Sequence, residues 1–156
     1  MPAVITGGGF VFLSGRMPNE TGTWALAPEA ETDPEYPFSE EAIKAQTDYV
    51  LADLVDTLTA AGSGVANVVK AQVYLDRLED FHAFDAVWGR YFSDRPPRTT
   101  VQAGPLPLHG ARLLVQLTAF RNAGPGVKNV ASERSPAPMV SYSQGRRADL
   151  RRRSTR

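Results

Sequence analysis

The sequence NVVKAQVYLD at residues 67–76 decides the fold of this 156-residue chain. Apolar residues alternate with polar ones along it, and the apolar set is Val69, Ala71, Val73 and Leu75. Successive side chains of a β-strand point to opposite faces, so this alternation predicts a strand with one buried face. The core is therefore expected to form against one side of a sheet.

A helix is predicted over residues 39–61, immediately before this strand. Ser39 is a good N-cap, and Glu40 and Glu41 fall in the first turn, where the helix dipole favours acidic side chains. Gly62 is a typical residue just after a helix C-terminus. Residues spaced by three or four form one stripe, made of Ile43, Thr47, Val50, Leu54, Leu58 and Ala61. This stripe is expected to face the sheet.

A second helix is predicted over residues 78–92, and Pro96-Pro97 limits its extent. It carries a stripe of large aromatic residues, namely Phe81, Phe84, Trp88, Tyr91 and Phe92. The stripe has two interpretations, a core face and a ligand pocket. The core interpretation is favoured, because this spacing is what a helix covering a sheet requires.

Further strands are predicted at residues 9–15, 98–103 and 112–120, where β-branched and aromatic residues gather. A turn is expected at Gly7-Gly8-Gly9, and a Pro-rich irregular loop, with a short strand near Trp24–Leu26, over residues 17–38. Two helices among these strands predict an α+β fold, with one mixed sheet and both helices on one face.

The composition restricts the class of protein. Cysteine is absent and no apolar run approaches the roughly 20 residues of a membrane span, so we expect neither disulfides nor a transmembrane helix. The N-terminus lacks the basic and apolar regions of a secretory signal, which favours a cytoplasmic protein. The two histidines, His82 and His109, are too few to indicate a transition-metal site.

Charge is distributed unevenly along the chain, although its formal sum is zero. Residues 146–156 hold six Arg and one Asp, whereas residues 1–145 hold 11 basic and 16 acidic residues. A basic tail is typical of a nucleic-acid-binding arm or of a solvated chain end. We favour the solvated end, because the acidic body would repel phosphate, and we do not expect a nucleic-acid partner.

Four segments resemble the Rid (reactive intermediate deaminase, or YjgF) family in the same order. They are FLSGR at residues 12–16, residues 60–76, residues 81–92 and PRTTV at residues 97–101. The resemblance covers residues 5–120, and the Pro-rich loop resembles a subgroup with an extended first loop. It implies a chorismate-mutase-like fold and a homotrimer with a small-molecule site between subunits.

The tail resembles the opening of the same family at residues 137–150, which follow a Gly- and Pro-containing linker. We therefore divide the chain into a Rid-like domain, residues 1–120, and a linker with a basic tail, residues 121–156. Two interpretations of the tail remain. It is either the truncated start of a second Rid domain, which we favour, or a permuted first strand that returns to the sheet.

The resemblance implies a cofactor-independent enzyme. Rid proteins hydrolyse enamine and imine acids, such as 2-aminoacrylate, to 2-keto acids and ammonia. An aminomuconate-type substrate is a neighbouring possibility within this class. The alternatives are a non-catalytic or impaired trimer that binds small carboxylates, and nucleic-acid binding through the tail, which would weaken steeply with salt.

Five residues are the candidate site. Arg98 matches the family arginine that holds the substrate carboxylate, and its planar guanidinium suits that anion, so it is the catalytic candidate. Thr100 lies two residues on, on the same face of the strand. Ser14, Asp85 and Tyr142 match other family positions as substrate-binding candidates. For Ser14 and Asp85, a hydroxyl bonded to the backbone and an exposed helix residue are the competing interpretations.

The last predicted strand departs from the family pattern. Leu114 stands where the family has a glutamate that orients water, and the nearby Gln116 cannot exchange a proton as a carboxylate can. Losing a general acid or base typically lowers a rate by about 10²–10⁴-fold. This departure casts more doubt on catalysis than on binding. His109 is a further candidate for the missing proton shuttle, against a plain loop histidine.

Overall fold

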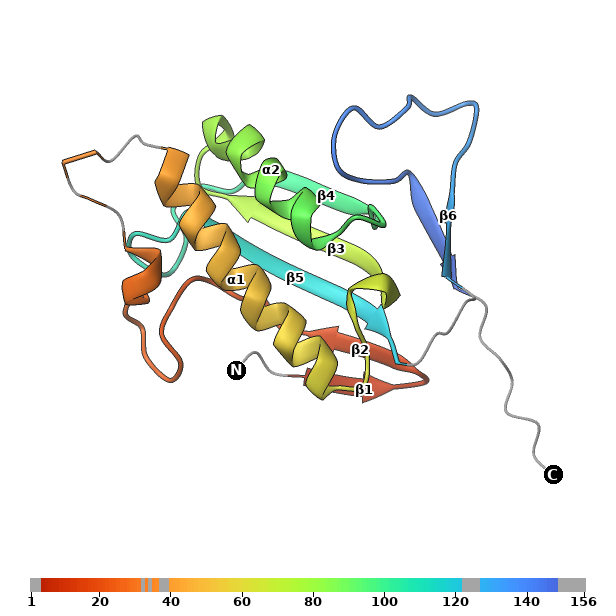
Figure 1. Cartoon of the computed structure of the whole chain (residues 1–156), viewed down its shortest axis with the longest axis horizontal. Coiled ribbons are helices and arrows are strands. Elements are labelled where there is room, and N and C mark those ends of the chain that lie inside the picture. Colours follow the sequence, from red (N-terminus) through yellow and green to blue (C-terminus); the bar gives the residue numbers. More distant parts are fainter. Residues whose placement is uncertain (1–3, 32, 34, 37–39, 122–126, 149–156) are drawn as a thin grey trace.

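The computed structural model describes residues 4–31, 33, 35–36, 40–121 and 127–148. One five-stranded sheet carries both α-helices on one of its faces (Figure 1). The predicted α+β arrangement is therefore confirmed. None of the helices in the described residues is long and apolar enough to cross a lipid bilayer.

The sheet is mixed, with the strand order β1-β2-β5-β3-β4. The strands in chain order are β1 Val4–Gly7, β2 Phe10–Leu13, β3 Val68–Leu75, β4 Arg98–Gln102 and β5 Leu113–Phe120. The pair β3–β4 is parallel and the other neighbours are antiparallel. The alternating stretch of the sequence is thus next to the strand that carries Arg98.

The N-terminal hairpin contains one strand that the sequence pattern did not predict. Strand β1 pairs with β2 so that Val4 lies opposite Leu13 at one end and Gly7 lies opposite Phe10 at the other. The predicted glycine turn joins them, and Gly8 and Gly9 have φ angles of 58° and 85°, which L side chains rarely adopt. Because all residues of β1 are exposed, no hydrophobic alternation marked this strand.

Helices α1, Glu40–Ala60, and α2, Phe81–Tyr91, cover the sheet. The end of α1 is as predicted, with Gly62 at a φ of 75°, while Ser39 lies outside the described residues. The second helix begins later than predicted, because residues 78–80 form a 3-10 turn before it.

The core lies between the helices and the sheet. Its members are apolar and almost fully buried, and the largest are Trp88, Phe84, Phe92, Leu13, Ile43, Leu51 and Leu54. The ring centres of Trp88 and Phe92 are 4.2 Å apart, and those of Trp88 and Phe84 are 5.7 Å apart. For these three aromatic residues, the core interpretation is confirmed.

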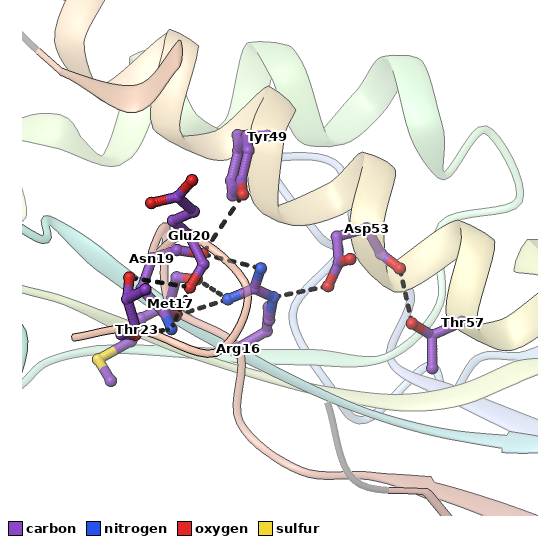
Figure 2. A network of polar contacts seen from close by, with 8 residues as sticks. All are labelled: Arg16, Met17, Asn19, Glu20, Thr23, Tyr49, Asp53 and Thr57. Atoms are coloured by element: carbon purple, nitrogen blue, oxygen red, sulfur yellow. Dashed lines mark hydrogen bonds and ion pairs between the residues drawn. The ribbon is translucent and has the colours of Figure 1, made fainter. Parts of the chain in front are cut away.

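A buried arginine holds the loop after β2 against α1 (Figure 2). Arg16 is 5% exposed, and its Nε lies 2.6 Å from Asp53 Oδ2. Its Nη1 donates to the backbone oxygen of Met17 at 2.8 Å and to Asn19 Oδ1 at 2.5 Å. Tyr49 lies on the same helix as Asp53, and its hydroxyl donates a hydrogen bond to the backbone oxygen of Asn19. One guanidinium therefore ties the loop to α1, in addition to the packing of the buried loop residues Pro18, Ala27 and Ala30.

Replacing Arg16 by alanine is expected to lower the free energy of unfolding by about 2 kcal/mol or more. The change removes several hydrogen bonds and leaves Asp53, which is partly exposed, without its counter-charge. Urea unfolding measures the effect. Arg90→Ala on the exposed face of α2 is the matched control, with a change within about 0.5 kcal/mol. Equal stability of the two variants would contradict this role of Arg16.

The tail forms a separate two-stranded sheet from β6, Val127–Val130, and β7, Gly145–Ala148. The sequence pattern did not predict these two short strands, because their residues are exposed or half-buried and no buried alternation marks them. The permuted-strand interpretation requires a tail strand in the main sheet. In the described residues, β1 occupies the place beside β2, and the tail adds no strand there.

Candidate functional site

Arg98 is the first residue of β4, and its side chain lies beneath α2. It pairs with Ala71, which is buried under the helices, so the two side chains share the helix-covered face of the sheet. The Arg98 side chain is only 1% exposed. Its guanidinium carbon lies 5.1 Å from the ring centres of both Phe84 and Trp88. The aromatic stripe therefore forms both core and the bed of a buried cation.

Asp85 is the partner of this cation. Its Oδ1 lies 2.7 Å from Arg98 Nη2, and its side chain is 14% exposed. Burial lowers the pKa of Arg98, and the hydrogen bond and charge of Asp85 act against this effect. The interpretation of Asp85 as an exposed helix residue is therefore excluded by the geometry. Asp85 helps to keep the buried guanidinium charged.

The guanidinium is only partly satisfied. Its Nε and Nη1 atoms are buried and have no hydrogen-bond partner within the described ranges. The Thr100 hydroxyl, two residues along β4, is also buried and has no partner in the part of the chain that the structure describes. Unpaired buried donors are costly, and they commonly mark a position that a ligand or water completes.

A pocket of about 730 Å³ opens beside these groups. Its walls come from the start of α2, from β4 and from the tail, and are formed by Leu78, Glu79, Phe81, His82, Arg98, Thr99, Thr100, Met139, Val140 and Tyr142. Among the described residues, the walls thus combine apolar side chains with polar ones and a single arginine. This combination suits a ligand with an anionic end and an apolar body.

The tail brings Tyr142 to the same pocket. The Tyr142 ring centre lies 5.9 Å from the Arg98 guanidinium carbon, on the tail side of the cation. The neighbouring Ser141 backbone N–H donates to Asp85 Oδ2 at 3.3 Å. Four predicted site residues, Arg98, Thr100, Asp85 and Tyr142, therefore meet in one chain.

The structure does not bring Ser14 to this group. Ser14 follows β2, and strands β5 and β3 lie between β2 and β4. At about 4.8 Å between neighbouring strands, β2 and β4 are roughly 14 Å apart. Leu114 pairs with Tyr74 and lies on the face away from the helices, and Gln116 shares that face. His109 is exposed in the loop before β5 and does not line the pocket. Their functional roles stay predictions.

Two titratable residues at the pocket were not among the candidates. Glu79 and His82 lie around the start of α2, and both line the wall beside Arg98. Their position three residues apart places them near one another on a helical turn. In the sequence, this spacing is the available signal that Glu79 and His82 act together. The aromatic residues around them favour the core interpretation of the segment instead. The described residues contain no group of three or more His, Cys, Asp and Glu residues able to hold a metal ion.

Asp85 competes with any carboxylate for the guanidinium, so Asp85→Asn is expected to tighten the binding of pyruvate about 10-fold. The variant removes a negative charge 2.7 Å from Arg98 and keeps an oxygen that accepts from Nη2. Isothermal titration calorimetry measures the affinity, with Asp56→Asn on the exposed side of α1 as control. Weaker binding by Asp85→Asn would mean that Asp85 mainly positions the guanidinium.

Sequence comparisons show which known proteins this chain resembles. A family model described as Endoribonuclease L-PSP matches residues 2–120. A RutC family protein of Synechocystis is 34% identical over 105 residues, which are 66% of this chain and 72% of that protein. The chloroplastic Reactive Intermediate Deaminase A of Arabidopsis thaliana is 33% identical over 100 residues, covering 64% of this chain and 47% of that protein.

Solved structures show the same architecture. A Klebsiella pneumoniae protein superposes with a TM-score of 0.64 and 29% identity, over 78% of this chain and 99% of that one. RidA from the bacterium Psychrobacter superposes with a TM-score of 0.61 and 26% identity, over 75% of this chain and 85% of that one. The chorismate-mutase-like α+β fold is thereby confirmed.

Proposed function

Since the chain belongs to the Endoribonuclease L-PSP family, which includes the YjgF, RutC and Rid proteins, we propose that it deaminates 2-imino acids by hydrolysis. The products are a 2-keto acid and ammonia, and no cofactor takes part. A relative named Reactive Intermediate Deaminase A, at 33% identity, supports this proposal at the level of the family.

The observation that carries the proposal is the partly unpaired guanidinium of Arg98. Two of its nitrogens are buried beside a pocket and have no partner among the described residues. A substrate carboxylate supplies the missing acceptors, and charge-assisted hydrogen bonds of this type contribute about 1.5–3 kcal/mol each. The arginine thus fixes one end of the substrate and leaves the C=N bond in the pocket.

The reaction itself is a hydrolysis. Water adds to the carbon of the protonated imine, the C–N bond breaks, and the nitrogen leaves as ammonium while the carbon becomes a ketone. Two steps need protons to move, from the attacking water and to the leaving nitrogen. The pocket offers His82, Glu79 and the Tyr142 hydroxyl for this transfer. The Thr100 hydroxyl, which no other described residue pairs with, is available for orienting water. These groups compensate for the leucine at position 114.

A second part of the proposal is a homotrimer with sites between subunits, and the exposed sheet face supports it. The sheet face away from the helices exposes large apolar side chains, among them Ile5, Phe12 and Val101 at 70%, 45% and 42%. An exposed apolar patch is typical of an interface. Association would also allow Ser14 of one copy to approach Arg98 of another. Light scattering tests this part, with three times the 17.0 kDa chain mass expected.

This pocket gives less support to the endoribonuclease activity that the family description names. Binding of an RNA backbone requires several Lys or Arg side chains. Among the described residues that line the pocket, Arg98 is the one Lys or Arg, and Asp85 already neutralises it. The stronger competitor is a carboxylate-binding protein without catalysis, because Leu114 replaces a glutamate of the family pattern.

The test of the proposed function is a competition assay. Oxidation of alanine by an amino acid oxidase produces 2-iminopropionate, and semicarbazide traps the part that has not yet been hydrolysed. The wild-type protein is expected to lower semicarbazone formation in proportion to its concentration. No effect of the protein, together with measurable binding of pyruvate, would replace the deaminase with the carboxylate-binding alternative.

A further inference from the structure

One side of the Arg98 pocket belongs to the tail rather than to the Rid-like domain. Met139, Val140 and Tyr142, here called the tail wall, line it together with apolar residues around the start of α2. Met139 is 95% exposed, so its side chain is open to contact with a ligand. The tail wall is therefore placed to contact whatever is attached to a carboxylate bound at Arg98.

Contacts on both sides of the tail wall hold it at the pocket. The Ser141 N–H donates to Asp85 Oδ2, and Ser141 also lies against α2 at Gly89. A Cβ atom at position 89 would come within 3.1 Å of Ser141 Oγ, so the absence of a side chain at Gly89 allows this close approach. The helix surface is thus shaped to receive the tail.

A second anchor lies in the tail hairpin. Arg146 in β7 donates to the backbone oxygens of Val68 at 2.7 Å and Asp94 at 2.6 Å, and to Asn129 Oδ1 at 2.8 Å. These bonds join the hairpin to the beginning of β3 and to the loop after α2. Figure 1 shows the tail, in blue, beside this end of the domain. The tail wall is consequently held from the hairpin as well as from Asp85.

The pocket is large for the smallest substrates of the proposed reaction. An imino acid with three carbons has six heavy atoms, and at about 30 Å³ for each, as for liquid water, it takes up roughly 180 Å³. The pocket measures about 730 Å³ and is mainly apolar. Resting on the proposed deaminase function, we infer that the tail wall makes this site selective for 2-imino acids with a branched or aromatic side chain.

Binding of two stable 2-oxo acids tests this selectivity in the full chain. Pyruvate and 4-methyl-2-oxopentanoate share the carboxylate and the ketone, and the second adds three apolar carbons. Each buried CH₂ group raises affinity roughly four-fold, so the larger acid is expected to bind at least about 10-fold more tightly. Calorimetry at one pH and salt concentration gives both affinities and does not depend on catalysis.

Two variants then separate the tail wall from the rest of the pocket. Gly89→Leu places a side chain where Ser141 lies, and it favours the helix, because leucine is a better helix former than glycine. Met139→Asn removes an apolar contact at the pocket itself. Both are expected to reduce the preference for the larger acid to less than about three-fold, with pyruvate affinity changed less than two-fold. Val130→Asn, an exposed apolar position of the same tail away from the pocket, is the control.

Three results of these binding measurements would contradict different parts of the proposal. Equal affinity of the wild type for both acids would overturn the inferred selectivity and leave the proposed function standing. A preference that survives both variants would overturn the role of the tail wall. Binding of neither acid would count against the proposed function itself, and the inference would fail with it.

Discussion

Arg98→Lys is expected to bind pyruvate at least about 100-fold more weakly than the wild type and to lose deaminase activity to a similar extent. Lysine keeps the positive charge, but it has one nitrogen in place of the three of the guanidinium. With that nitrogen near Asp85, no donor remains at the positions of Nε and Nη1. Calorimetry and the semicarbazide assay measure the two losses.

The controls for this variant address charge and folding separately. Arg90→Lys on the exposed face of α2 makes the same exchange away from the pocket and is expected to change neither quantity. The double variant Arg98→Gln with Asp85→Asn removes both buried charges together, so no unpaired charge stays in the core. Carboxylate binding by this folded double variant at wild-type strength would show that Arg98 is not the anion site.

Trp88→Ala is expected to lower the free energy of unfolding by about 3–5 kcal/mol. Trp88 is fully buried between Phe84 and Phe92, and it also lies against the Arg98 guanidinium. Truncation leaves a large cavity and removes one aromatic face from the buried cation. At this chain length the melting temperature should fall by roughly 10 °C or more.

The matched control is the second tryptophan of the chain. Trp24 is 76% exposed in the loop after β2, so Trp24→Ala should change stability by no more than about 0.5 kcal/mol. Trp88→Phe keeps an aromatic face on Arg98 and is expected to lose less stability than Trp88→Ala. A Trp88→Ala protein as stable as Trp24→Ala would contradict the place of this residue at the centre of the core.

The parts of the fold that the sequence predicted well have a strong periodic signal. Residues 69–75 alternate, and the observed strand β3 has the predicted bounds Val68–Leu75, although an irregularity between Val68 and Lys70 buries Val68 in place of the predicted Val69. The long stripe over residues 39–61 became α1 with a one-residue difference at each end. Both patterns arise from burial on one face, so the sequence alone shows them.

Elements without a buried face were missed for the same reason. Strand β1 is exposed along its length, and β6 and β7 are held by backbone pairing and by the Arg146 hydrogen bonds. No hydrophobic period marks such segments. The ion pair of Arg16 likewise has no periodic signal in the sequence, because its partner Asp53 lies 37 residues away in α1.

The candidate site was only partly predictable. Arg98, Thr100 and Tyr142 were found through their resemblance to a family, and the structure brings them together. The ion pair of Arg98 with Asp85 was not predicted, because it depends on how α2 packs over β4. Ser14 lies three strands from Arg98, so its predicted role depends on contact between copies of the chain.

Binding of the substrate carboxylate by Arg98 can be seen in a crystal structure of the protein with 2-oxobutanoate. We expect the carboxylate within about 3 Å of Arg98 Nε or Nη1, at ordinary hydrogen-bond distance, with the rest of the ligand in the pocket beside the tail wall. Ligand bound elsewhere, with both of these nitrogens still lacking a carboxylate, would contradict it.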